Sequence, residues 1–293
     1  MAAVGIAAIG LCMSNLPDLS VCFRRVNGVL TRFYRVGDGA PVMLIHGAGV
    51  PAEIWLRNIQ PLARRFQICA MDTLGSGFTE PGAYVSGPIH THVLQHLFAL
   101  ADDLGFQRFA VVGSSLGGLF ATLMALEEPD RISHVIAVGA GSVFNNKDEY
   151  IATWKAVRAN GGNAFDNPTL ESCRIRMSRL VRRIDQIPDS LLVMQMTCYA
   201  LPGAAELFAR RADGMLDPIS VEKYRVVDRL EELRAPFLAI NGAQDPRCKL
   251  GQVQQNIERI QGGRFEAIKN CGHYPQIEVA DRFNAFVSDF LAQ

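Results

Sequence analysis

Short apolar runs recur along most of the chain, and most of them are continuously apolar instead of alternating with polar residues. Runs of this kind, rich in β-branched residues, are typical of strands that are covered on both faces of a sheet. The first two, separated by the turn "GDGAP", are interpreted as a hairpin that feeds a buried strand. The predicted strands cover residues 29–36, 42–47, 66–72, 109–113, 134–139, 237–242 and 264–270.

Between these runs lie segments in which apolar residues recur with the 3.6-residue period of an amphipathic helix. Alternation of strands and helices predicts an α/β fold with a doubly wound, mostly parallel sheet. The functional loops of such a sheet gather at the carboxyl ends of its strands. The predicted helices cover residues 89–105, 116–130, 250–261 and 280–293.

One region interrupts the alternation, because residues 144–228 contain no buried strand run. Two stretches within it, 168–184 and 189–212, have helical patterns with arginine and methionine mixed into them. An all-helical insertion between two strands is most simply a cap over the carboxyl edge of the sheet. The predicted organisation is an N-terminal extension at 1–25, an α/β core at 26–143 and 229–293, and a helical cap at 144–228.

The amino-acid composition excludes some classes of binding partner. The 293 residues include 29 basic and 29 acidic side chains, so the net charge is zero. Nucleic acids and anionic membranes attract clustered positive charge, so neither is expected as a partner, and a small-molecule substrate fits better. The seven cysteines are scattered without a C-x-x-C pair, which predicts neither a disulfide framework nor a zinc cluster and favours the cytoplasm.

The stretch "VVGSSLGG" at 111–118 contains the first candidate catalytic motif. Residues 113–117 match G-x-S-x-G, the nucleophile elbow, in which a strand turns sharply into a helix and exposes the middle serine. A predicted strand precedes the motif and a predicted helix follows it, as the elbow requires. Ser115 is therefore the predicted nucleophile. Ser114 is the small residue before it and is expected to line the pocket.

A serine hydroxyl needs a histidine base and an orienting carboxylate, and in this kind of sheet they follow in the order serine, acid, histidine. Asp245 lies just beyond a predicted strand, and His273 lies on a loop before the last helix. Ser115, Asp245 and His273 therefore follow one another in the expected order. Asp245 could instead be an ordinary turn residue. His92 and His96 in "HTHVLQH" have i, i+4 spacing, but without a nearby acidic ligand we expect no metal there.

Two backbone amides should form the oxyanion hole. We assign one to Leu116, directly after the nucleophile, and one to Ala48 in "HGAGVP". Gly47 and Gly49 on either side of Ala48 let the backbone approach a substrate, and His46 is interpreted as a structural anchor of this loop.

These residues resemble the α/β-hydrolase fold family from about residue 29 to the end of the chain. Within that family, segments 112–118, 187–206 and 271–291 resemble the meta-cleavage product hydrolases, which cut a C–C bond in dienoates formed by ring opening of catechols. The resemblance implies that Ser115 attacks a carbonyl carbon in an acyl-enzyme or gem-diol type step. His273 would move the protons and Asp245 would hold the imidazole, with no metal or organic cofactor.

The chain departs from that family at several substrate contacts. Gln195 stands where the family has a carboxylate-binding arginine, Ser114 where it has asparagine, and Tyr274 where it often has tryptophan. A cap arginine could substitute for the missing one; the candidates are Arg174, Arg176, Arg179 and Arg182. Otherwise the substrate is a neutral ester, lactone or amide. A ligand receptor without catalytic activity is a third hypothesis, and the sequence leaves a homodimer open.

Overall fold

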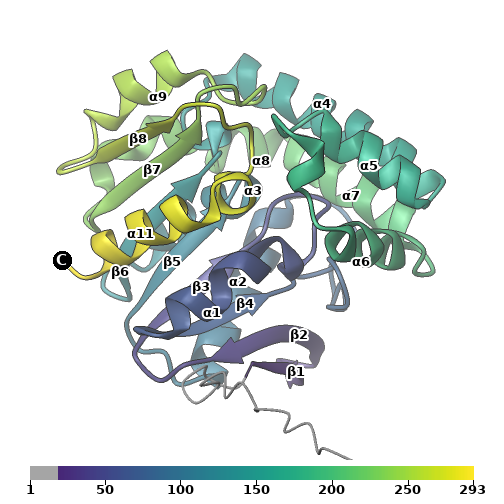
Figure 1. Ribbon diagram of the computed structural model, residues 1–293, viewed down its shortest axis with the longest axis horizontal. Helices are drawn as coiled ribbons and strands as arrows, with labels where there is room; N and C mark the ends of the chain where they lie inside the picture. The colour runs from purple at the N-terminus through teal and green to yellow at the C-terminus, as the bar shows by residue number, and fades with distance from the viewer. Residues whose placement is uncertain (1–18) are drawn as a thin grey trace, which may run out of the picture.

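The computed structural model describes residues 19–293. Of the N-terminal extension predicted at 1–25, residues 1–18 lie outside the described residues. Eight strands form one sheet in the order β1-β2-β4-β3-β5-β6-β7-β8 (Figure 1). Their bounds are β1 Ser20–Val26, β2 Val29–Val36, β3 Ala40–Ile45, β4 Phe66–Met71, β5 Phe109–Ser114, β6 Ile132–Val138, β7 Phe237–Gly242 and β8 Arg264–Ile268.

The sheet is mostly parallel, as the alternation of strands and helices predicts. Strands β3 to β8 run parallel to one another, whereas β2 pairs antiparallel with β4 and β1 pairs antiparallel with β2 at one edge of the sheet. The chain therefore has the predicted α/β architecture. The carboxyl ends of the parallel strands lie along one edge, where their loops can converge.

The predicted hairpin between β2 and β3 is wrong. β4 lies between these two strands, and β2 instead forms a hairpin with β1, which begins at Ser20 inside the predicted N-terminal extension. Asn27 and Gly28 connect β1 to β2 with φ values of 47° and 83°. Two successive positive φ angles define the tight turn that suits a two-residue hairpin, and an Asn-Gly pair tolerates them.

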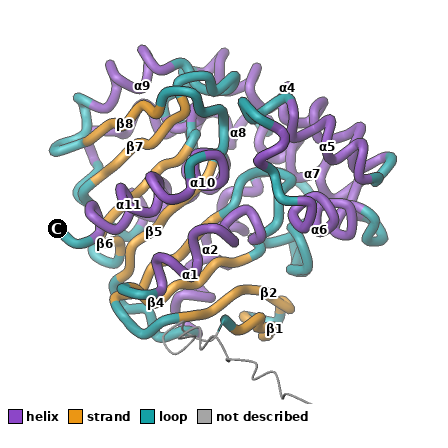
Figure 2. The backbone as a smooth tube through the Cα atoms, in the orientation of Figure 1, coloured by secondary structure: helices purple, strands orange, loops and turns teal. Residues whose placement is uncertain are grey.

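Helices cover both faces of the sheet and divide the core into two apolar layers. Figure 2 shows α1 and α11 close together, and they pack with α10 against one face. Helices α2, α3 and α9 contribute to the apolar layer on the other face. The bounds of these helices are α1 Leu56–Ala63, α2 Ile89–Asp103, α3 Leu116–Glu127, α9 Leu250–Ile257, α10 Pro275–Glu278 and α11 Ala280–Leu291.

Five helices between β6 and β7 form the insertion where the cap was predicted. In Figure 1 most of them gather to one side of the sheet. They are α4 Lys147–Asp166, α5 Leu170–Ser178, α6 Asp189–Tyr199, α7 Ala204–Leu216 and α8 Pro218–Lys223. Short 3-10 turns cover Ala52–Trp55, Gly141–Val143, Ile184–Gln186 and Val226–Glu232.

Within residues 19–293, no single helix is both long and apolar enough to cross a membrane. The pair α6 and α7 meets the criteria of length and composition only when taken together, and the two helices are bent by 91°.

Candidate active site

Ser115 occupies a strained turn between β5 and α3. Its φ and ψ angles are 54° and −114°, a backbone conformation that residues other than glycine rarely adopt. A Cβ on Gly113 would lie 2.0 Å from the Gly117 carbonyl oxygen, and a Cβ on Gly117 would lie 2.1 Å from the Ile45 carbonyl oxygen. The two flanking glycines are therefore required by close backbone contacts, and the turn holds Ser115 at the carboxyl end of the central strand.

His273 and Asp245 meet at the same edge of the sheet. Nδ1 of His273 lies 2.9 Å from each carboxylate oxygen of Asp245. The histidine is 2% exposed and the aspartate 8% exposed. Asp245 Oδ1 also accepts a hydrogen bond of 2.8 Å from the Arg247 backbone amide. This arrangement orients the imidazole and leaves Nε2 as the nitrogen available for proton transfer.

The loop that carries His273 is fixed to both the core and the cap. The buried carboxylate of Glu278 accepts hydrogen bonds from the backbone amides of Gly272, at 3.0 Å, and of Arg182, at 2.8 Å. The backbone amide of His273 donates to the Leu180 carbonyl oxygen in the insertion at 2.8 Å. The position of the imidazole therefore depends on contacts from two separate parts of the chain.

The backbone of the predicted oxyanion loop is oriented by His46. The Thr73 amide donates to His46 Nε2 at 2.9 Å, so the ring proton is on Nδ1, which donates to the Gly47 carbonyl oxygen at 2.7 Å. Burial lowers the pKa of His46, which keeps the ring neutral. Because the peptide is planar and trans, the Ala48 N–H points away from the Gly47 carbonyl. That amide has no acceptor within residues 19–293. Leu116 begins α3, where the first amides lack an intrahelical acceptor.

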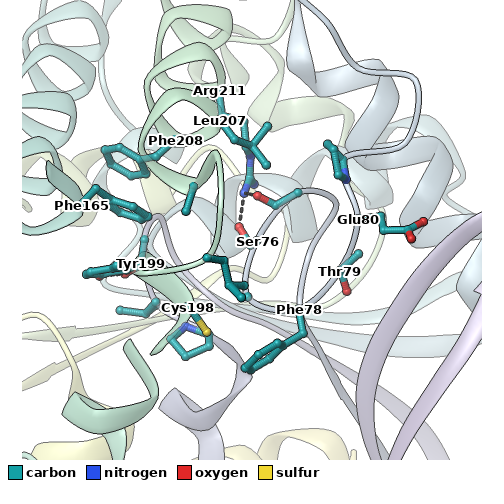
Figure 3. Close-up of a pocket in the computed structure, with 18 of the residues that line it drawn as sticks. Ser76, Phe78, Thr79, Glu80, Phe165, Cys198, Tyr199, Leu207, Phe208 and Arg211 are labelled. Atoms are coloured by element: carbon teal, nitrogen blue, oxygen red, sulfur yellow. Dashed lines mark hydrogen bonds between the residues drawn. The ribbon is translucent and has the colours of Figure 1, made fainter. Parts of the chain in front are cut away.

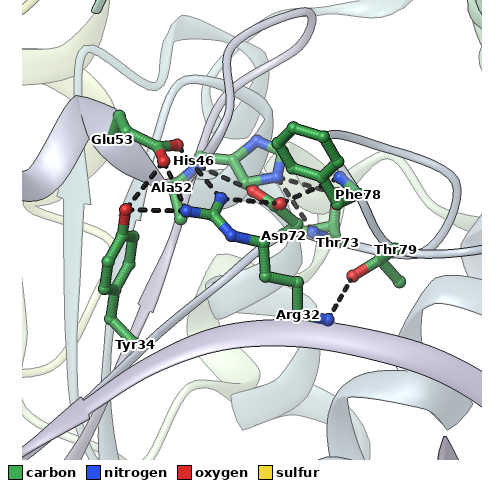
Figure 4. Close-up of polar contacts among 9 residues, drawn as sticks. All are labelled: Arg32, Tyr34, His46, Ala52, Glu53, Asp72, Thr73, Phe78 and Thr79. Atoms are coloured by element: carbon green, nitrogen blue, oxygen red, sulfur yellow. Dashed lines mark hydrogen bonds and ion pairs between the residues drawn. The ribbon is translucent and has the colours of Figure 1, made fainter. Parts of the chain in front are cut away.

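A buried ion-pair network lies next to this loop (Figure 4). Arg32 donates to Glu53 Oε1 at 2.5 Å and to Asp72 Oδ2 at 3.1 Å. Asp72 in turn accepts from the amides of Ala52 and Phe78, at 2.8 Å and 3.0 Å. Burial opposes the charge of Arg32, but hydrogen bonding and attraction from the two carboxylates raise its pKa overall. The network connects β2 to the segments that follow β3 and β4.

Ser115 lines two small cavities between the core and the insertion. His273, Arg247 and Val157 line both cavities with it. Each has a volume of about 10 Å³, which is room for about one water molecule. A larger substrate therefore has to displace side chains of the insertion when it binds.

A larger cavity of about 330 Å³ lies further out, between the insertion and the loop at 75–81 (Figure 3). Phe165 stacks on Tyr199 and on Phe208, with ring centroids 3.8 Å and 4.3 Å apart. Phe208 and Arg211 also line an apolar cavity of about 20 Å³ that reaches Ala48 and Leu116. The outer cavity therefore adjoins the predicted oxyanion hole, with Phe208 at the boundary.

The structure brings some of the predicted substrate contacts to the site and leaves others away from it. Tyr274 lines a cavity with Ser115, and Gly49 lines the apolar cavity beside Ala48. Ser114 is fully buried, and its Oγ accepts a hydrogen bond of 2.9 Å from Gln276. Gln195 is also fully buried, lines none of the cavities described above, and donates from Nε2 to Met177 Sδ at 3.3 Å.

Gly47 lies against the nucleophile. A Cβ on Gly47 would be 3.1 Å from the Ser115 Cβ. Any larger residue at this position would crowd the serine, so Gly47 allows the close approach expected from the sequence.

Several residues at the site were not identified from the sequence. Arg247 follows the acid by two positions, and Arg211 and Phe208 come from α7. The sequence around Asp245 indicates a loop that carries the catalytic acid. It does not indicate which neighbouring side chain points into the cavity, because that direction depends on tertiary packing.

The histidine-rich stretch on α2 forms separate contacts in the core. The His90 ring stacks on the Tyr224 ring with centroids 4.5 Å apart, and His96 Nε2 lies 2.8 Å from Thr31 Oγ1. Among residues 19–293, no group of three or more His, Cys, Asp or Glu side chains is placed to hold a metal ion.

Comparisons with known proteins agree with the fold described above. A sequence-family model described as alpha/beta hydrolase fold matches residues 40–183. The chain is 27% identical over 276 residues to a 2-hydroxy-6-oxo-2,4-heptadienoate hydrolase of Pseudomonas putida, covering 90% of this chain and 94% of that protein. It is 26% identical over 266 residues to a 2-hydroxy-6-oxononadienedioate/2-hydroxy-6-oxononatrienedioate hydrolase of Paraburkholderia xenovorans, covering 87% and 88%.

A crystal structure of a meta-cleavage product hydrolase superposes with a TM-score of 0.76 at 26% identity, covering 94% of this chain and 98% of the other. The dienoate hydrolase of a Rhodococcus strain has a TM-score of 0.80 at 19% identity, covering 94% of this chain and 100% of the other, which supports the fold. The chain is a hydrolase of the α/β-hydrolase fold and resembles the meta-cleavage product hydrolases over most of its length.

Proposed function

We propose that this chain hydrolyses a C–C bond next to a ketone in a 2-hydroxy-6-oxo-dienoate, with Ser115, His273 and Asp245 as its catalytic triad. The observation that carries the proposal is the meeting of the strained Ser115 turn and the His273–Asp245 pair at one buried cavity. The names of the relatives support the choice of bond, because those proteins are hydrolases of dienoates with a 6-oxo group.

The proposed reaction begins when the 2-hydroxy-dienol form of the substrate loses its hydroxyl proton and gains a proton on carbon, which gives the 2-oxo tautomer. Ser115 Oγ then adds to the carbon of the 6-oxo group while His273 Nε2 accepts the serine proton. The amides of Ala48 and Leu116 donate to the oxyanion. When the tetrahedral adduct collapses, the bond to the dienoate chain breaks, and the departing carbon takes a proton from His273.

The remaining acyl group is an ester of Ser115. Water, deprotonated by His273, attacks this ester and releases a carboxylic acid, and the serine regains its proton. Asp245 stabilises the imidazolium in both halves of the reaction through its contacts of 2.9 Å with Nδ1. The sum is one water consumed and one C–C bond exchanged for a carboxyl group and a C–H bond.

The test measures hydrolysis of 2-hydroxy-6-oxohepta-2,4-dienoate by the loss of its absorbance and the release of acetate. We expect turnover by the wild type and none by Ser115→Ala, which should still bind substrate because the hydroxyl contributes to chemistry and not to core packing. Ser178→Ala, which changes an exposed serine on α5, serves as the matched control and should be unaffected.

Aryl acetates assayed in parallel distinguish the C–C activity from ester hydrolysis. Efficient cleavage of aryl acetates with no turnover of the dienoate would contradict the proposed bond and identify an esterase. Loss of all activity in Ser114→Ala, with full activity in Ser115→Ala, would contradict the assignment of the nucleophile.

A further inference from the structure

The loop that carries the predicted oxyanion amide lies between β3 and the first 3-10 turn. β3 ends at Ile45 and the turn begins at Ala52, so residues 46–51 belong to no strand or helix. The Ala48 amide nevertheless has to keep one orientation, because an oxyanion hole stabilises charge best when its donors are placed before the charge develops. Contacts from neighbouring side chains are therefore needed to hold this loop.

Side chains donate hydrogen bonds to three consecutive carbonyl oxygens of the loop. His46, within the loop, donates to the first of them. Arg176 on α5 donates from Nη2 to the Ala48 oxygen at 2.8 Å. Tyr199 on α6 donates from its hydroxyl to the Gly49 oxygen. The second and third donors thus come from the insertion, although the loop belongs to the α/β core.

The insertion packs directly on the backbone at Gly49. The φ angle of Gly49 is 64°, and a Cβ there would lie 2.7 Å from Arg176 Nη2 and 3.2 Å from Phe208 Cε2. A side chain at this position would push the insertion away from the loop. Glycine therefore permits the close approach that the two hydrogen bonds from the insertion require.

Tyr199 is a well-held donor. It is 4% exposed, and its ring stacks on Phe165 with centroids 3.8 Å apart (Figure 3). Burial raises the pKa of the Tyr199 hydroxyl, although the charge of Arg176 opposes the shift. The hydroxyl therefore keeps its proton, and it is the donor in this contact because a carbonyl oxygen can only accept.

We propose that Tyr199 is a positioning residue for the oxyanion hole and acts through its hydrogen bond to the Gly49 carbonyl oxygen. Peptide groups are planar, so holding the Gly47 and Gly49 carbonyls restricts rotation of the Ala48 amide between them. The insertion thereby completes a site that belongs to the core. This role rests on the proposed function, since it requires that addition of Ser115 places an oxyanion at the Ala48 amide.

The kinetic test uses Tyr199→Phe, which removes the hydroxyl and keeps the stacked ring. Without this hydrogen bond the loop adopts more orientations, so the Ala48 amide is aligned less often when the oxyanion forms. We expect kcat for 2-hydroxy-6-oxohepta-2,4-dienoate to fall about tenfold. KM should change by less than about twofold, because an oxyanion donor supports the transition state more than the bound substrate.

Tyr84→Phe is the matched control. The Tyr84 hydroxyl also connects the core to the insertion, because it donates to the carbonyl oxygens of Gly87 at 3.1 Å and of Arg210 on α7 at 3.0 Å. It does not contact the oxyanion loop. This variant removes a similar hydrogen bond between the same two parts of the chain, and its kcat should be unchanged.

A second measurement reports on the oxyanion hole without turnover. The probes are 7,7,7-trifluoro-6-oxoheptanoate and 6-oxoheptanoate, which differ only in fluorination. The fluorinated ketone is activated, so Ser115 Oγ adds to its carbonyl carbon, the serine proton moves to His273, and an oxyanion forms at the Ala48 amide. By calorimetry, wild type should prefer the fluorinated ketone by roughly a hundredfold or more. Tyr199→Phe should lose about tenfold of this preference, and Tyr84→Phe should keep it.

Thermal unfolding of each variant shows whether it is folded. Phe165→Leu, which keeps the hydroxyl but removes the stacked ring, should show a smaller loss of the same preference. An unchanged preference in Tyr199→Phe, or equal losses in Tyr199→Phe and Tyr84→Phe, would overturn the positioning role. A rise in KM with kcat unchanged would also overturn it, because the hydroxyl would then contact the substrate.

Two further outcomes separate this role from the proposed function. Equal binding of the two ketones to wild type would contradict the oxyanion hole at Ser115 and overturn the role of Tyr199 with it. If the preference is present and Tyr199→Phe reduces it while dienoates are not cleaved, the proposed C–C activity fails and the role of Tyr199 stands. The kcat comparison then uses an aryl acetate.

Discussion

At the scale of single residues, the position of the His273 imidazole depends on one carboxylate. Asparagine in place of Asp245 keeps the shape of the side chain but removes the charge that supports the imidazolium. Its amide can also donate to Nδ1, which would favour the tautomer with the proton on the wrong nitrogen. Asp245→Asn should therefore lower kcat by roughly 10⁴-fold.

The control for this prediction is Asp185→Asn, which changes an exposed aspartate paired with Arg183 and should leave kcat unchanged. Steady-state rates on one substrate provide the comparison. A decrease of less than about tenfold in Asp245→Asn would mean that a different acid orients the histidine.

Gln195 provides a second prediction at this scale. The sequence suggests that it replaces a carboxylate-binding arginine, but the side chain is fully buried beside Met177 and its Oε1 has no hydrogen-bond partner within the described residues. Gln195→Met removes the unsatisfied oxygen and nearly preserves the volume. We expect unchanged kcat/KM and a free energy of unfolding raised by up to about 1 kcal/mol. A clear rise in KM for an anionic substrate would instead restore Gln195 as a substrate contact.

At the scale of elements, the close packing of α3 against β3 holds the nucleophile and the oxyanion loop together. A Cβ on Gly117 would lie 2.1 Å from the Ile45 carbonyl oxygen and 2.7 Å from the His46 carbonyl oxygen. These are backbone atoms, so the helix or the strand would have to shift. Gly117→Ala should lower both the melting temperature and kcat, because the shift also moves Ser115 relative to Ala48.

Gly162→Ala is the opposite case within a helix. A Cβ at Gly162 on α4 has open space around it. Alanine costs less backbone entropy than glycine in a helix, so the variant should gain up to about 1 kcal/mol of stability. Gly117→Ala and Gly162→Ala make the same substitution within a helix and differ in what surrounds the new Cβ. Equal melting temperatures for the two variants would contradict the argument that close packing requires Gly117.

At the scale of the whole molecule, buried neutral histidines connect stability to pH. Burial lowers the pKa of His90 to about 3 and that of His96 to about 4, whereas in the unfolded chain both titrate near the ordinary value of about 6.5. Below that value the unfolded state binds more protons than the folded state. Stability is therefore fully present above about pH 6.5 and falls as the pH decreases, by up to about 1.4 kcal/mol per pH unit for each histidine.

Urea unfolding at several pH values between 7.5 and 5 measures this slope. Glutamine in place of His96 should lower by about one the number of protons taken up on unfolding. The free energy of unfolding should then fall less steeply as the pH decreases. A free energy of unfolding that increases on acidification through this range would contradict the expected sign.

The sequence alone determined the features that depend on local pattern. The continuous apolar runs predict the parallel strands, because a strand covered on both faces needs apolar residues at every position. The G-x-S-x-G segment predicts the turn at Ser115 from five consecutive residues. The contact that requires Gly113 lies within this segment, whereas the one that requires Gly117 is with Ile45 on the neighbouring strand β3. Asp245 and His273 follow from their order along the chain and their place after strands, and the structure brings them together.

Tertiary structure alone decided the pairing of strands and the direction of side chains. The insertion of β4 between β2 and β3 depends on contacts between segments distant in sequence. Arg176 and Arg247 come from segments 71 positions apart, and their shared cavity exists only when the insertion lies against the acid loop. Gln195 was expected at the cavity, but the packing of α6 against α5 places its amide next to Met177 and away from the cavities. A residue's identity specifies which contacts it can make, whereas packing between distant segments selects which of them it does make.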